Sequence, residues 1–203
     1  MLKKYYNQIK GLERDFLLFL LIGVLLGVGQ SIDGSTMNNF LREKFELLVL
    51  ERTMLEIPRE FPGLLVFVVI GFLFRLGDIR IAALANLAAA VGMFFLGIIP
   101  YNFFLMLLVI FIYSLGQHLF MPLFQSIGMS FAQEGQYGKK LGQLSATNTA
   151  ALVLSSVVLW VLFKYFHISY TVSFTLGALA FAAAAFLLLK MNHRRMADLN
   201  HRF

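Results

Sequence analysis

Residues 16–37 read FLLFLLIGVLLGVGQSIDGSTM, and this stretch decides the class of fold. A helix needs about 20 mostly apolar residues to cross a hydrocarbon core of about 30 Å. The stretch meets that length, and it is too long for a secretory signal peptide and lacks the small-residue cleavage site of one. We therefore interpret it as a membrane-spanning helix of the mature protein.

Five further segments of the 203-residue chain have the same character. With 59% hydrophobic and 14% charged residues, and a mean hydropathy of +0.77, the chain has too little polar surface for a soluble globule. The composition predicts an all-α integral membrane protein, with residues 1–203 forming a single domain. The six predicted spans are about 16–37, 57–77, 80–99, 103–132, 141–164 and 168–190.

The charged segment at about residues 38–56, between the first two spans, permits two interpretations. Apolar Leu47, Leu50, Met54 and Ile57 follow helical spacing, which favours an amphipathic helix lying on the outer surface of the membrane. The glutamates mixed with basic residues favour a charged loop with a single helical turn to the same extent. Both interpretations stay open on the sequence.

Lys and Arg residues are distributed unevenly between the two sides of these spans. Twelve lie on the side of the two termini and five lie on the other side. Because basic residues concentrate in cytoplasmic segments, we expect a multi-pass protein of the cell membrane with both termini in the cytoplasm. The net charge of +6 comes from these dispersed residues, so the expected partner is the lipid bilayer and not nucleic acid.

Signatures of catalysis and of metal binding are absent from the sequence. The chain has no cysteine, and its four histidines are scattered, without the spacing of metal ligands. The patterns of zinc proteases, Walker loops and dinucleotide-binding folds do not occur. We expect no metal, no cofactor and no enzymatic activity.

The functional chemistry is then expected among polar residues that lie inside the spans. A charged or ionisable side chain there costs on the order of 2.5–3.5 kcal/mol, and so indicates a pathway or a buried pair. His118 lies near the middle of its span in SLGQHLFMPL, residues 114–123, and Pro122 has no N–H for the His118 carbonyl. This pattern predicts a cavity wall, with Gln125 on the same helix face. A packed histidine hydrogen-bonded to a neighbouring helix is the alternative for His118. Asp33, in the outer part of the first span, is the second candidate, and helix-end or interfacial satisfaction is its alternative.

Taken together, these features resemble the amino-terminal half of a major facilitator superfamily transporter. The resemblance rests on six spans with both ends cytoplasmic, the short link FRLGDIRIAA (74–83), the outer turn PYN (100–102), the basic link EGQYGKKLGQ (134–143) and a basic tail. In the family signature of the first link, Asp78 matches the acid. Phe74 and Ile79 depart from the pattern, while Arg75 and Arg80 keep basic charge nearby.

The resemblance implies a bundle of two three-helix repeats that faces a second bundle across a substrate cavity. The first, second, fourth and fifth spans would line the cavity, and Asp78, Arg75 and Arg80 would form a gating loop, although Asp78 would otherwise simply cap the third span. The implied function is transport of a small solute by alternating access, as one half of a proton- or ion-coupled secondary transporter. The implied substrate or proton contacts are Gln30, Asp33, Gln117, His118, Gln125 and Asn148.

Two questions about the whole assembly stay open on the sequence. The chain is expected to be a fragment, a split half that pairs with a second six-helix half, or a protein that assembles with a second copy of itself. The competing function is that of a non-transporting scaffold or assembly subunit, whose polar residues bind partner helices. No motif in the sequence specifies the solute, the direction of transport or the coupling ion.

Overall fold

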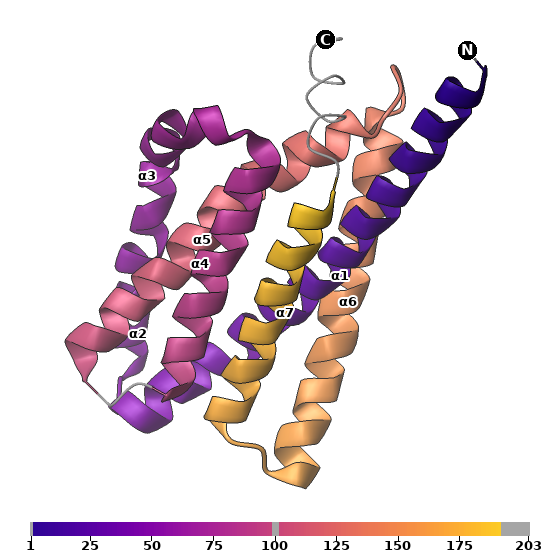
Figure 1. Ribbon diagram of the computed structural model, residues 1–203. Coiled ribbons are helices and arrows are strands. Elements are labelled where there is room, and N and C mark those ends of the chain that lie inside the picture. Colours follow the sequence, from indigo (N-terminus) through magenta and orange to yellow (C-terminus); the bar gives the residue numbers. More distant parts are fainter. Residues whose placement is uncertain (1, 99–101, 192–203) are drawn as a thin grey trace.

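The computed structural model describes residues 2–98 and 102–191, with side chains from Glu13 onward, and it is helical throughout its regular structure (Figure 1). Six segments are long and apolar enough to cross a membrane, by length and composition. The beginning of α1 and the end of α7 lie at the same end of the bundle, which we call the terminal end. We call the other end the opposite end.

The helices follow one another with short connections. They are α1 (Leu2–Phe45), α2 (Val49–Met54), α3 (Glu56–Leu73), the 3-10 turn η1 (Phe74–Leu76), α4 (Asp78–Ile98), α5 (Phe103–Ser130), α6 (Tyr137–Phe166) and α7 (Tyr170–Lys190).

All six predicted spans are helical in the described part of the chain, and five begin or end within four residues of the predicted limits. The prediction for residues 38–56 is wrong in its limits. Residues 38–45 continue α1, only α2 forms a separate short helix, and α2 to η1 make up the second span, Val49–Leu76. Ile99, the first two residues of the predicted outer turn 100–102 and the basic tail after Met191 lie outside the described residues.

The helix ends are set by local hydrogen bonds. Asn102 accepts a bond from the N–H of Leu105 at 3.1 Å and so caps α5, and Ser169 accepts one from Val172 at 3.3 Å and caps α7. Gly77 precedes α4 with a φ of 78°, which glycine adopts without steric cost. These ends leave α4 and α7 with 21 residues each, about 32 Å of helix, close to the thickness of a hydrocarbon core.

Helices α4 and α7 form the centre of the bundle. In their most apolar windows, 56% and 50% of the residues are buried, against 6% in the second span and 11% in α6. Small residues also allow α5 to approach α4 closely: a Cβ added at Gly92 of α4 or at Gly116 of α5 would overlap the backbone of the other helix. Helices α3 and α6 are therefore peripheral and expose apolar side chains over most of their length.

The helices pack in a regular set of pairs. Helix α1 packs against α6 and α7, α5 packs against α3 and α4, and α4 packs against α7. By contrast, α5 and α6 contact each other only slightly. The space between α5 and α6 is where the candidate site lies.

The contacts of α1 and α5 with α4 and α7 show how far the polar residues of α1 and α5 lie from the ends of the bundle. The ring of Phe40 contacts those of Tyr170 and Phe174, so residue 40 marks the start of α7 at the opposite end. Asp33 lies seven residues earlier in α1, about 10 Å inside that boundary. Gly116 of α5 lies against Ala85 and Ala89, at the middle of α4, and this places His118 near the middle of the bundle.

Candidate functional site

A cavity of about 330 Å³ lies between α1, α5 and α6. It extends from the level of His118 toward the terminal end, where Gln125 and Leu141 line it. Its lining residues are Leu26, Gln30, Gln117, His118, Phe120, Met121, Phe124, Gln125, Leu141, Leu144, Ser145, Asn148 and Thr149.

The cavity brings together five of the six residues expected to contact solute or protons. Gln30 comes from α1, Gln117, His118 and Gln125 come from α5, and Asn148 comes from α6. The sixth, Asp33, is not among the lining residues. No residue of α3 is among them either, whereas the family resemblance implied a contribution from the second span.

A polar contact joins α1 to α6 beside the cavity. The side-chain amide of Asn148 donates to the carbonyl of Gly23 at 3.1 Å and to Oε1 of Gln30 at 3.2 Å. This is possible because Gly27 brings the two backbones close: a Cβ there would lie 2.9 Å from the Cβ of Ala151. Gln30 and Asn148 are therefore held as a pair and present their remaining amide groups to the cavity.

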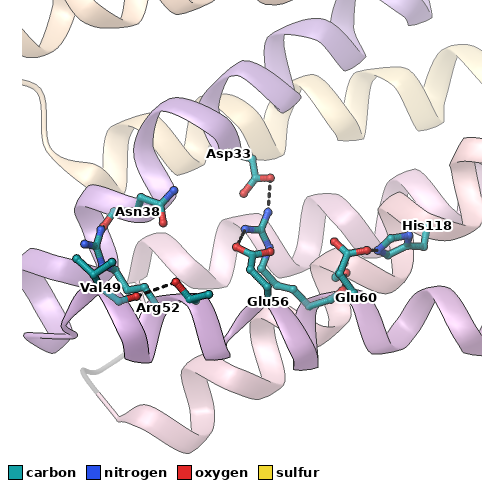
Figure 2. Close-up of polar contacts among 10 residues, drawn as sticks. Asp33, Asn38, Val49, Arg52, Glu56, Glu60 and His118 are labelled. Atoms are coloured by element: carbon teal, nitrogen blue, oxygen red, sulfur yellow. Dashed lines mark hydrogen bonds and ion pairs between the residues drawn. The ribbon is translucent and has the colours of Figure 1, made fainter.

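His118 has an acidic partner on the peripheral helix α3. Its Nε2 lies 3.4 Å from Oε2 of Glu60, and the side chains are 22% and 68% exposed. Gly63 allows this approach, since a Cβ at that position would lie 3.2 Å from Nδ1. His118 thus lies beside a carboxylate of a neighbouring helix (Figure 2) and is also one of the residues that line the cavity.

Helix α5 continues through Pro122 without interruption. Proline lacks an N–H, so it gives the carbonyl of His118 no helical hydrogen bond. Pro122 is exposed, and it lies between Met121 and Leu123 on the turn that follows His118. The break in the hydrogen-bond ladder that the sequence predicted is therefore present, but it does not end the helix.

Asp33 pairs with Arg59, one of the basic residues that the sequence analysis used only to predict the orientation of the spans. Its Oδ2 lies 2.8 Å from Nη2 of Arg59 on α3, and the two side chains are 17% and 21% exposed. Nη1 of Arg59 also bonds Glu56 at 3.1 Å (Figure 2). Oδ2 of Asp33 is therefore paired with a basic group of a neighbouring helix.

Helix α5 contributes to this cluster from the other side. The hydroxyl of Ser114 donates to the backbone carbonyl of Arg59, and the buried phenol of Tyr113 lies close to Asp33 and Arg59. Within the described residues, Oδ1 of Asp33 is buried and has no hydrogen-bond partner. The cluster ties α1, α3 and α5 together between the cavity and the opposite end.

The expected gating residues lie at the terminal end, away from the cavity. Asp78 is the first residue of α4 and accepts a bond from Ser126 at 3.2 Å, while the carbonyl of Gly77 accepts bonds from the N–H groups of Arg80 and Ile81. The guanidinium of Arg75 lies 5.8 Å from the ring centre of Phe74, and Arg80 is exposed. In the part of the chain with described side chains, no salt bridge joins Asp78 to either arginine.

The fold and this cavity define a six-helix membrane protein with a polar hollow at membrane depth. No protein-family model, curated protein or solved structure matches the chain. Among the described residues, no three His, Cys, Asp or Glu side chains form a group that could hold a metal ion.

Proposed function

We propose that this chain is one half of a secondary transporter of the major facilitator type, which moves a small solute across the membrane by alternating access. The observation that carries the proposal is the cavity itself. Polar groups at membrane depth are costly, and here seven polar side chains, from three helices that are far apart in sequence, line one hollow. Such an arrangement is typical of a solute pathway.

The pairing of the helices supports a construction from two three-helix repeats. If α1, α3, α4 and α5, α6, α7 are two repeats, then exchanging α1 with α5, α3 with α6 and α4 with α7 should preserve the helix contacts. The pair α1–α6 then becomes α5–α3, the pair α1–α7 becomes α5–α4, and α4–α7 maps onto itself, so every close pair maps onto another close pair. Internal repeats that meet at a substrate site are the common plan of secondary transporters.

Exposed polar side chains at membrane depth support the need for a second bundle. Glu60 is 68% exposed, although it lies at the level of His118 in the second span. Gln125 and Gln143 are exposed as well. A carboxylate facing lipid at that depth is unfavourable by a few kcal/mol, so water or protein is expected to cover this face. A second six-helix half or a second copy of the chain would supply the cover.

His118 is the best candidate for coupling to protons. Histidine is the side chain whose charge most readily changes near cellular pH, and this one contacts both the cavity and a carboxylate. The excess of basic residues at the terminal end orients that end to the cytoplasm. The cavity would then extend toward the cytoplasm, and the Asp33–Arg59 cluster would separate it from the outside.

Reconstitution into proteoliposomes tests this proposal. The chain alone, diluted so that copies do not meet, should give no saturable uptake, because one bundle provides only one wall of an alternating-access cavity. Two copies fused in tandem, or the chain co-expressed with a complementary six-helix half, should give saturable uptake that Asn148→Leu reduces. Saturable uptake by isolated single chains, or its absence from every assembled form, would reject the proposal.

A scaffold subunit is the second candidate, and the observation that favours it is the loose attachment of α3. Only 6% of the apolar window of the second span is buried, so a partner helix could pack along it. In that case, substitutions on exposed apolar positions such as Phe67 and Phe72 should abolish co-purification of a partner. Substitutions in the cavity should leave such an assembly intact, which distinguishes the two functions.

A further inference from the structure

The polar lining of the cavity has a composition that selects among solutes. Four carboxamides, two hydroxyls and one imidazole line it: Gln30, Gln117, Gln125, Asn148, Ser145, Thr149 and His118. Among the described lining residues there is no Asp, Glu, Lys or Arg. Glu60 lies 3.4 Å from His118 and provides a counter-charge when the imidazole is protonated. The lining therefore offers a charged solute no uncompensated opposite charge.

The charge of the solute determines how favourably it binds at this depth. An ion that enters a low-dielectric site loses its hydration, and it recovers that loss only beside an opposite charge with good geometry. Neutral polar groups lose less, and carboxamides and hydroxyls can replace their bonds to water. A neutral solute is therefore favoured over a cation or an anion of equal size.

The kind of neutral group follows from the donors and acceptors. A carboxamide both donates and accepts, and so does a hydroxyl. Asn148 uses its amino group on Gly23 and Gln30, which leaves its oxygen to accept, while the amino group of Gln30 is left to donate. A solute with several hydroxyl groups can satisfy such a mixed set, because each of its groups also donates and accepts.

The remaining wall is aromatic and apolar. The ring centre of Phe124 lies 5.7 Å from that of Phe120 and 5.1 Å from that of Phe19, so the three tilted rings form one aromatic cluster beside the cavity. A ligand that fits this site has a polar edge and an apolar face. The volume of 330 Å³ equals that of about 11 water molecules at about 30 Å³ each, which sets the size at about a dozen non-hydrogen atoms.

We infer that the cavity binds an uncharged, hydroxyl-rich ring compound of monosaccharide size, with its hydroxyl edge on the carboxamides and its apolar face on Phe120 and Phe124. This inference rests on the proposed function, and it names the class of solute. The Gln30–Asn148 pair fixes one side of the site, and His118 with Gln117 fixes another.

Equilibrium binding to the purified full chain in lipid nanodiscs tests it. The probes are D-glucose and myo-inositol, which are uncharged, and D-glucosamine and D-glucuronate, which have the ring of glucose with one positive or one negative charge. We expect an uncharged probe to bind at least tenfold more tightly than either charged one. Asn148→Leu and Gln125→Leu should each weaken its binding by about fivefold, the loss of one hydrogen bond. Gln143→Leu, on an exposed position of α6 outside the cavity, should leave binding unchanged.

Two variants are needed because Asn148→Leu also removes a bond between α1 and α6, whereas Gln125 is exposed and its loss leaves the packing intact. Equal or tighter binding of a charged probe, no saturable binding of either uncharged probe, or binding that both variants leave unchanged would each overturn the inference. The proposed function fails separately. Selective binding without uptake by any assembled form would reject transport alone, and saturable uptake of a charged solute only would reject the solute class alone.

Discussion

The carboxylate of Asp33 on α1 and the guanidinium of Arg59 on α3 lie 2.8 Å apart and are mostly buried. This pair is the main polar link between the peripheral second span and the first helix. Removing one partner leaves the other charge buried without compensation, a loss of about 3 kcal/mol or more. Arg59→Met and Asp33→Asn should therefore each lower the melting temperature in detergent.

The double variant Asp33→Asn/Arg59→Met should regain part of this loss, since it leaves neither charge unpaired. Arg42→Met is the matched control. Arg42 lies 3.9 Å from Glu43 with both side chains at least half exposed, and its loss should change the melting temperature little. Additive effects of the two single substitutions would show that the pair contributes no coupling.

The approach of α1 to α6 at Gly27 gives a second prediction. A methyl group at this position would lie 2.9 Å from both the Cβ of Ala151 and the backbone nitrogen of Leu152, so Gly27→Ala should separate the helices and reduce thermal stability. Gly34→Ala on the same helix has nothing within 4 Å and should be neutral or slightly stabilising, because alanine favours helix by about 1 kcal/mol over glycine. Equal melting temperatures for the two variants would contradict this account of the α1–α6 contact.

The contact between His118 and Glu60 predicts a pH dependence. The imidazole lies 3.4 Å from the carboxylate of Glu60, so the proposed role of His118 in proton coupling can be tested at this contact. Uptake by the assembled transporter should therefore change with pH, and Glu60→Gln should alter this dependence because it removes the charge beside the imidazole. His118→Gln cannot titrate and should flatten the profile while expression stays normal.

Other charges near His118 are already paired or distant. On α3, Arg59 bonds Asp33 and Glu56, and the residues of α4 beside Gly116 are alanines. His118→Leu should in addition weaken solute binding, since it removes a polar group from the cavity. If His118→Gln lowered only expression or melting temperature and left the pH profile unchanged, the role of His118 would be packing alone.

The number of spans and most of the polar cavity residues could be predicted from the sequence, and the physical reason is the membrane. Long apolar runs leave little choice of fold, and a polar residue such as His118 or Asn148 in such a run stands out. Helical spacing then predicted that Gln125 shares a face with His118, and both line the cavity.

The contacts of α3 could not be predicted in the same way. Arg59 and Glu60 lie in a segment rich in charges, so nothing in the local pattern separates the arginine that enters the bundle from its neighbours at Arg52 and Glu56. Their partners Asp33 and His118 are 26 and 58 residues away and meet them only through packing. The continuation of α1 to Phe45 was missed for a related reason, because a helix that leaves the membrane loses its apolar signal.

The most direct test of the central claim is the labelling of a single cysteine in the cavity. The chain has no native cysteine, so Ser145→Cys introduces one reactive thiol among the lining residues. A membrane-impermeant maleimide is applied from each side of the membrane in turn. Glu134→Cys, in the link between α5 and α6, and Leu47→Cys, between α1 and α2, mark the terminal and opposite ends. Val153→Cys, on the exposed apolar face of α6, is the lipid-facing control.

Ser145→Cys should react from the cytoplasmic side, as Glu134→Cys does, and an uncharged solute should slow the reaction. Leu47→Cys should react only from outside, and Val153→Cys from neither side. A Ser145→Cys thiol that stays as unreactive as Val153→Cys, or that reacts only from the side of Leu47→Cys, would contradict a water-filled solute cavity that extends toward the cytoplasm.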